Sequence, residues 1–209
     1  EEKYGKDVVE QGGLKVYTTI DSELQDYAEK IAFEKGPTNK TNFGANNIAI
    51  LTINAKTGEI LAMVGSSDYF NEEIDGNVNV VLRPRQPGSA FKPIVYTQAF
   101  YNGYGPGSVI YDIPTKIGPD RPQDFDGRWQ GQITIRRALG QSRNIPAIKA
   151  YYIAGEEEKV LDFVDKLGIT NLRKFRDEFN KDAVKRGWTF YFGWPMAIGS
   201  GEVRLMDLV

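Results

Sequence analysis

Ser89 and Lys92 are the first residues whose types and spacing could do chemistry. They lie in the segment 85–93, Arg-Gln-Pro-Gly-Ser-Ala-Phe-Lys-Pro, where a Pro-Gly turn precedes an apolar run. Ser89 is therefore predicted at the start of a helix, with Lys92 three residues later on the same face of the first turn. The unpaired backbone N–H groups and the dipole at that end would stabilise an alkoxide on Ser89 or an oxyanion beside it.

Lys92 is the candidate base for removing the proton from Ser89. A free lysine has a pKa of about 10.4, so its amine becomes neutral near pH 7 only when it is buried or lies beside another cation. Arg83 and Arg85 are cations close by in the sequence. The alternative is a chance match, because a lone S-x-x-K motif arises easily in a chain with this many serines and lysines.

Ser142 and Asn144 form a second candidate pair. The S-x-N triplet 142–144 follows a predicted short helix, and a hydroxyl and an amide two residues apart in a loop can point the same way. Ser142 could relay a proton to a leaving group, and Asn144 could hold a substrate amide or the Lys92 ammonium. Taken alone, the triplet is more typical of a helix cap, since Ser and Asn favour cap positions.

Composition excludes several kinds of site. The 209 residues contain no His and no Cys, which removes Ser-His-Asp and Cys-His catalysis, thiolate chemistry, disulfides and zinc sites built on these residues. No metal-ligand spacing is present, and no cofactor is expected. The formal charge is −2, so no basic field favours nucleic acid as a partner. No run approaches the roughly 20 apolar residues of a membrane span, and the acidic opening residues do not resemble a signal peptide.

The N-terminal part is predicted to hold a strand and a helix. Apolar and polar residues alternate over 14–20, which predicts a strand. Asp21 is a suitable N-cap, and the apolar stripe after it predicts a helix over 22–35 that Gly36-Pro37 ends. The polar stretch 37–47 is then predicted to be a loop.

A β-hairpin is predicted next. Two apolar, β-branched runs, 48–53 and 60–64, flank the turn residues 54–59. The turn contains Lys56-Thr57-Gly58, and polar residues followed by glycine are ordinary turn chemistry. This triplet is therefore predicted to be a turn rather than a catalytic element.

The remaining chain is predicted to be mainly helical after an irregular crossing over 65–87. Helices are predicted over 89–101, from the N-cap Thr134 to Gly140, over 145–154 and over 156–167. Residues 104–131 hold much of the remaining Gly and Pro and are predicted to be loop-rich. Asp124 and Asp126 are expected to be turn residues in that loop.

These motifs together resemble those of penicillin-binding proteins. Ser89-Ala90-Phe91-Lys92 and Ser142-Arg143-Asn144 occur in the family's order. Lys56-Thr57-Gly58 spells the third family motif but precedes Ser89, whereas the catalytic triplet follows S-x-N. Longer strings resemble the bifunctional class A type, and the resemblance runs from about Gly12 to the last residue. The strings are 85–93, Tyr17-Thr18-Thr19-Ile20-Asp21 with Leu24-Gln25, Lys56-Thr57-Gly58-Glu59-Ile60-Leu61-Ala62, and Ser142-Arg143-Asn144-Ile145-Pro146-Ala147.

The resemblance implies a role for each matching residue. Ser89 would be the acyl-forming nucleophile, and its backbone N–H would supply half of the oxyanion hole. Lys92 would be the base, Ser142 the proton shuttle, and Asn144 the residue that positions substrate. The implied reaction is D,D-transpeptidation: the enzyme attacks the D-Ala-D-Ala end of a peptidoglycan stem peptide, releases D-Ala, and passes the acyl group to an amine on a neighbouring strand. β-Lactam antibiotics would acylate the same serine.

The fold implied is α/β (α+β), the transpeptidase fold shared by penicillin-binding proteins and serine β-lactamases. In that fold a helical subdomain packs on an antiparallel sheet, with the active site between them. Residues 1–45 are expected to form a linker strand and helix leading into the domain. Residues 46–209 are expected to be the N-terminal portion of the transpeptidase domain.

The chain is expected to be a fragment, because nothing after Asn144 resembles a catalytic K-T-G. The C-terminal part of the domain, as a continuation or a second polypeptide, would carry that strand, its two neighbours and the other oxyanion donor. The glycosyltransferase domain and membrane anchor of the class A type are likewise expected to lie outside these 209 residues. The full-length protein is expected outside the cytoplasm, in the cell envelope at the outer face of the bacterial cytoplasmic membrane.

Two other functions stay open. A serine β-lactamase uses the same acylation and adds fast hydrolysis, which needs a placed carboxylate or a modified lysine, and no residue is nominated for that. A β-lactam sensor or non-catalytic scaffold would keep S-x-x-K without turnover.

Overall fold

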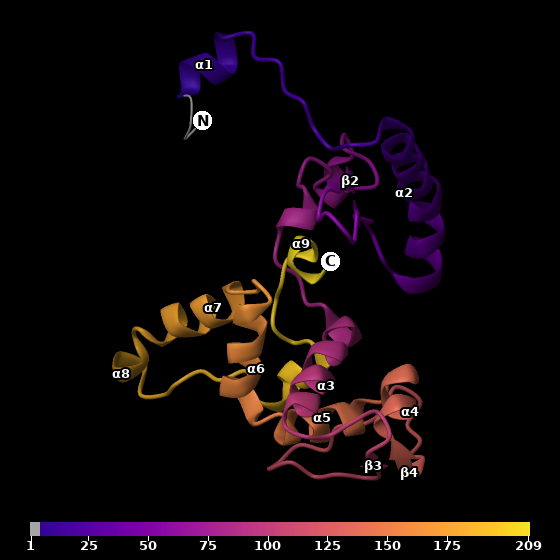
Figure 1. The fold of residues 1–209 in the computed structure, drawn as a ribbon, viewed down its shortest axis with the longest axis vertical. Helices are drawn as coiled ribbons and strands as arrows, with labels where there is room; N and C mark the ends of the chain where they lie inside the picture. The colour runs from indigo at the N-terminus through magenta and orange to yellow at the C-terminus, as the bar shows by residue number, and fades with distance from the viewer. Residues whose placement is uncertain (1–4) are drawn as a thin grey trace. The chain divides into compact units, whose positions relative to one another are not determined.

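The computed structural model describes residues 5–209, which divide into two compact units (Figure 1). The first unit ends at Val81 and also includes Val209, and the second covers Leu82–Leu208. Among the residues described, no helix has both the length and the apolar character that crossing a membrane requires.

The first unit consists of two helices and a hairpin. These elements are α1 (Lys6–Gln11), α2 (Ser22–Phe43), β1 (Ile50–Ile53) and β2 (Ile60–Val64), followed by the short 3-10 helices η1 (Glu72–Ile74) and η2 (Val80–Leu82) near the junction. Helix α2 packs on β2 through a small buried cluster of Ala28, Ala32, Ala62 and Val64. Small side chains at helical spacing let the helix backbone lie close to the hairpin.

The predicted hairpin is confirmed. Strands β1 and β2 pair antiparallel, with Ile50 opposite Val64. The Asn54 carbonyl accepts hydrogen bonds from the N–H groups of Thr57 at 3.2 Å and Gly58 at 2.8 Å. Gly58 has φ of 75°, a left-handed backbone that favours glycine. The K-T-G triplet at 56–58 is therefore the turn of this hairpin.

The predicted end of the helix at Gly36-Pro37 is wrong. Helix α2 continues through Pro37 to Phe43 and ends at Gly44, whose φ is 66° and whose N–H caps the last turn. Proline lacks one N–H donor, which weakens a helix without forcing it to stop. The later left-handed glycine is the effective stop signal. The predicted loop over 37–47 accordingly begins only after Phe43.

The predicted strand over 14–20 is also wrong. This segment has no regular structure, and each of its residues is exposed. Only its end is attached to the hairpin, where Thr19 Oγ1 donates to the Ile60 carbonyl at 2.6 Å and the Asp21 N–H donates to the Leu61 carbonyl at 2.9 Å. Alternating apolar and polar residues form a strand only where a partner strand and a buried face are available.

The second unit is mainly helical and contains one short sheet. Its elements are η3 (Gly88–Phe91), α3 (Lys92–Tyr101), β3 (Val109–Asp112), β4 (Gly131–Thr134), α4 (Ile135–Gly140), α5 (Asn144–Ile153), α6 (Glu156–Lys166), α7 (Asn171–Asn180), α8 (Ala183–Arg186), η4 (Trp194–Ile198) and α9 (Leu205–Leu208). The predicted helices α3 to α6 are confirmed within a few residues. The first turn of the helix predicted over 89–101 is a 3-10 turn.

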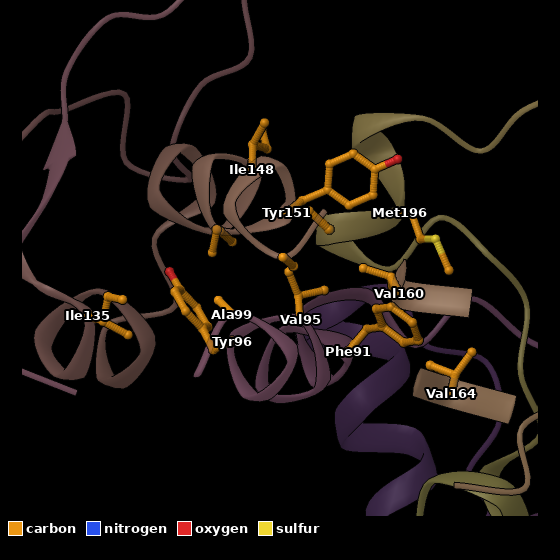
Figure 2. Close-up of a cluster of buried hydrophobic side chains, with 14 of the residues drawn as sticks. Phe91, Val95, Tyr96, Ala99, Ile135, Ile148, Tyr151, Val160, Val164 and Met196 are labelled. Carbon is orange, nitrogen blue, oxygen red and sulfur yellow. The ribbon is translucent and has the colours of Figure 1, made fainter. Parts of the chain in front are cut away.

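One apolar core holds α3, α5, α6 and η4 together (Figure 2). Val95 and Tyr96 of α3 and Ile148 and Tyr151 of α5 are all buried in it, and Met196 of η4 joins them. Helices α3 and α5 carry Lys92 and Asn144 at their first residues. This core therefore sets the distance between the two motifs.

The stretch predicted as loop-rich, 104–131, contains β3 and the start of β4. They pair antiparallel with Val109 opposite Thr134. Each strand has four residues, too few to establish a period-two pattern among the surrounding Gly and Pro residues. Helix α7 was not predicted either.

Candidate active site

The segment before Ser89 is anchored to a distant part of the second unit. Arg85 and Val203 exchange two backbone hydrogen bonds of 2.9 Å, and the Gly88 N–H donates to the Gly199 carbonyl at 3.3 Å. Gly88 has φ of 56°, which permits the sharp entry into η3. Ser89 follows as an exposed residue, and within residues 5–209 its hydroxyl makes no hydrogen bond.

Lys92 lies one turn further on and is only 1% exposed. Its Nζ donates to the Ser142 carbonyl at 2.6 Å, to Asn144 Oδ1 at 2.7 Å and to Ser142 Oγ at 3.2 Å. An ammonium has three donors, and each finds one acceptor here. The structure thus brings together three of the four predicted site residues, with Ser89 three residues before Lys92 in the same helical segment.

The pKa of Lys92 is lowered from 10.5 to about 8. Burial is the main cause, because it penalises the charged amine. The carboxyl of Asp124 opposes this change, and the guanidinium of Arg143 adds to it. Arg143 is therefore the cation that acts on Lys92, and not Arg83 or Arg85, the nearby cations in the sequence.

The cap interpretation of the S-x-N triplet is wrong. The N-cap residue of α5 is Arg143, and it makes no side-chain cap bond. Ser142 has φ of 53° and lies between α4 and α5, with its oxygens turned to Lys92. Asn144 is the first residue of α5, and its Oδ1 also accepts from Lys92. Both polar side chains therefore accept hydrogen bonds from Lys92 and do not cap a helix end.

The real cap of α5 comes from the loop between β3 and β4. A carboxylate oxygen of Asp124 accepts the N–H of Asn144 and lies 3.4 Å from the N–H nitrogen of Ile145. The Gln123 carbonyl accepts from Asn144 Nδ2 at 2.9 Å. Asp124 is thus far more than the turn residue that the sequence suggested.

Arg143 is buried behind the site. Its guanidinium pairs with Asp112 at 2.9 Å, Asp126 at 2.9 Å and Asp124 at 3.3 Å. Asp126 does act as a turn residue, since it accepts the Arg128 N–H at 3.0 Å, but its other oxygen binds Arg143. In the described part of the chain, no group of acidic side chains is arranged to hold a metal ion.

This network could not be predicted from the sequence because its members lie far apart in the chain. Asp112 and Arg143 are separated by 31 residues. The only local signal was a basic residue between Ser142 and Asn144, with several acidic residues in the preceding loop.

Known sequences that match this chain include penicillin-binding proteins and their transpeptidase domain. Residues 48–201 match the model of the penicillin-binding protein transpeptidase domain. Penicillin-binding protein 1A of Rickettsia conorii is 36% identical over 131 residues, covering 60% of this chain and 16% of that protein. Penicillin-binding protein 2D of Bacillus subtilis is 31% identical over 180 residues, covering 81% of this chain and 25% of that protein. The chain thus spans a quarter or less of the length of these two relatives.

Solved structures agree on the fold. Penicillin-binding protein 1A from Haemophilus influenzae aligns with a TM-score of 0.61 and 26% identity over 77% of this chain and 22% of that one. The penicillin-binding protein PonA1 from Mycobacterium tuberculosis aligns with a TM-score of 0.72 and 21% identity over 98% of this chain and 50% of that one. The predicted transpeptidase fold is confirmed, and the chain belongs to the family of penicillin-binding protein transpeptidase domains.

Proposed function

We propose that the chain is the acylating part of a peptidoglycan D,D-transpeptidase of the bacterial cell envelope, with Ser89 as nucleophile. The observation that carries the proposal is the Lys92 cluster. A buried lysine with a lowered pKa, one turn after an exposed serine, is bound by the serine and asparagine of the second motif. Perturbed groups gathered in this way are typical of acid–base catalysis.

Lys92 is the proposed base in its neutral form. A neutral amine keeps two N–H donors and gains a lone pair. The two shorter hydrogen bonds, to the Ser142 carbonyl and Asn144 Oδ1, can persist in that state. The lone pair then accepts a hydroxyl proton, and transfer from Ser89 Oγ produces the attacking alkoxide.

The proposed acylation step uses these groups. Ser89 Oγ bonds to the carbonyl carbon of the penultimate D-Ala, and the peptide bond to the terminal D-Ala breaks. The proton taken by Lys92 returns to the leaving amine through Ser142 Oγ, 3.2 Å from Lys92 Nζ. The backbone N–H of Ser89 is the proposed oxyanion donor on this chain. An amine of a neighbouring strand then bonds to the acyl carbon, the ester bond to Ser89 breaks, and the proton lost by the amine returns to Ser89 Oγ.

Stem peptides and β-lactams are the proposed ligands, with no role for nucleic acid. A β-lactam offers Ser89 a strained amide at which to form the same ester. PonA1, which shares this fold, has been solved in complex with penicillin V. That complex makes a labelled penicillin the direct probe for the present chain.

The test uses the full-length protein with labelled penicillin and a stem peptide. We expect a stable adduct on Ser89, release of D-Ala from the peptide, and no labelling of Ser89→Ala. Labelling of Ser89→Ala would remove Ser89 from the mechanism. Rapid penicillin hydrolysis would instead indicate a β-lactamase, and an adduct without peptide turnover would indicate a sensor or scaffold.

A further inference from the structure

Arg143 separates the two polar residues of the second motif, and its side chain binds a different set of groups. It is 1% exposed, and the side chains of Asp112 and Asp124 are fully buried beside it. The guanidinium also donates to the Arg128 carbonyl. Strand β3 and the loop after it are thereby tied to the turn between α4 and α5. A planar guanidinium has five N–H donors in a fixed fork, a geometry that the compact ammonium of a lysine cannot reproduce.

Asp124 and the preceding residue, Gln123, determine how Asn144 is oriented. Asp124 accepts the Asn144 backbone N–H, and the Gln123 carbonyl accepts from Asn144 Nδ2. With Nδ2 committed to a carbonyl, the opposite end of the amide must be the acceptor. That end, Oδ1, lies 2.7 Å from Lys92 Nζ. The loop between β3 and β4 therefore sets the amide orientation that Lys92 requires.

The same network holds Ser142 in an unfavourable backbone conformation. A left-handed φ of 53° costs a non-glycine residue roughly 1 kcal/mol or more. Such strain persists only when surrounding contacts hold the backbone in place. The next residue, Arg143, is held by three carboxylate partners, and this fixes the backbone at Ser142. The strained turn directs both Ser142 oxygens to Lys92.

The network contains more carboxyl groups than cations. Three carboxyls surround one guanidinium, and two of them are fully buried. Asp112 Oδ1 makes no hydrogen bond to any of the residues described, and Asp124 Oδ2 lies 3.3 Å from the Arg143 guanidinium. Burial, together with the nearby Asp112, raises the pKa of Asp124. The carboxyls of Asp112 and Asp124 thus meet at one buried guanidinium, which links β3 and the loop after it to the residue between Ser142 and Asn144.

We infer that Asp124 and Arg143 are positioning residues for acylation of Ser89, an inference that rests on the proposed function. Arg143, held by Asp112, Asp124 and Asp126, keeps Ser142 and Asn144 facing Lys92. Neither residue touches the reacting atoms. Both act by fixing the groups that bind the base.

The test measures acylation of the full-length protein by labelled penicillin, separating the rate constant at saturation from the concentration dependence. We expect Asp124→Ala to acylate at least about tenfold more slowly at saturation, because small displacements of catalytic groups have effects of this size or larger. Asp124→Asn should lose less than Asp124→Ala, because its amide oxygen keeps the acceptor for the Asn144 N–H while its NH2 group replaces the oxygen that pairs with Arg143. Arg143→Lys should lose about tenfold.

The chain offers a matched control in Arg173. This arginine of α7 also binds three carboxylates, those of Glu158, Asp162 and Asp165 in α6. Arg173→Gln should therefore lower thermal stability while leaving acylation within about twofold of the parent. Thermal melts followed by circular dichroism establish that each variant is folded at the assay temperature. If Asp124→Ala does not fold, Asp124→Ser replaces it, with a loss in the same direction.

The outcomes are distinct. If the parent protein is not labelled, or Ser89→Ala is labelled, the proposed function fails. If the parent is labelled on Ser89 and folded Asp124→Ala and Arg143→Lys acylate at the parent rate, the positioning role is overturned. If Asp124→Asn is as slow as Asp124→Ala, the contribution assigned to the hydrogen bond between Asp124 and the Asn144 N–H is overturned. Faster acylation by Asp124→Asn than by a slow Asp124→Ala supports that contribution.

Discussion

Lys92 Nζ lies 2.7 Å from Asn144 Oδ1, although the two residues are 52 positions apart in the chain. Each is the first residue of its helix, α3 or α5, and these helices pack against each other in the core. The contact joins the two sequence motifs into one site. Because the loop between β3 and β4 orients the Asn144 amide, the protonation of Lys92 also depends on the geometry of that loop.

Acylation is expected to rise with pH through a midpoint near 8. The lowered pKa of Lys92 is about 8, and only the neutral amine can accept the Ser89 proton. About a tenth of the amine is neutral at pH 7, so the rate constant there should be about a tenth of its alkaline plateau. Labelled penicillin and a rapid quench at pH 6 to 10 measure this. A flat profile would contradict the assignment of Lys92 as base.

Replacing Ser142 by glycine and by alanine separates its hydroxyl from its backbone. Both variants lose Oγ, which should slow acylation by about 10²-fold or more if it relays the proton. Glycine adopts φ of 53° freely, so Ser142→Gly should be about 1 kcal/mol more stable than Ser142→Ala. Urea unfolding and labelled penicillin provide the two measurements. Acylation at the parent rate in Ser142→Gly would exclude the relay.

Gly199→Ala should disrupt the segment before the nucleophile. A Cβ at this position would lie 2.1 Å from the Gly88 carbonyl oxygen, and its φ of 79° also disfavours alanine. Since Gly88 precedes Ser89, we expect lower thermal stability together with slower acylation. Gly107→Ala is the control, because nothing lies within 4 Å of a Cβ there. Parent-like acylation in Gly199→Ala would show that this contact does not position Ser89.

Ile148→Ala should weaken the core between the two motif-bearing helices. The side chain is 1% exposed, and its truncation should lower the free energy of unfolding by about 2–5 kcal/mol. Val184, which is 95% exposed, is the control, and Val184→Ala should change the free energy of unfolding by about 0.5 kcal/mol or less. Urea unfolding measures both. Equal effects of the two substitutions would contradict the packing described for α5.

Lys56→Ala should leave acylation unchanged. The K-T-G triplet at 56–58 forms a hairpin turn, and Lys56 is exposed there. The variant should be labelled by penicillin at the parent rate, within the error of the assay. A large loss of labelling would show that this turn takes part in catalysis after all.

Several features followed from the sequence because their causes are local. The S-x-x-K spacing places Ser89 and Lys92 one turn apart, and Thr134 caps α4 by accepting the Arg137 N–H as its residue type predicted. The hairpin turn at 56–58 follows from polar residues and a glycine. Each of these depends on neighbours within about four positions, where backbone geometry alone decides which groups meet.

Other features were decided by tertiary structure. The lowered pKa of Lys92 required burial in the folded chain, and the partners of Arg143 came from β3 and a distant loop. Pro37 did not end α2, since an interior proline only weakens a helix whose remaining hydrogen bonds hold. Local spacing determines which side chains share a turn. Which turns meet depends on how the apolar core packs, and only the folded chain decides that.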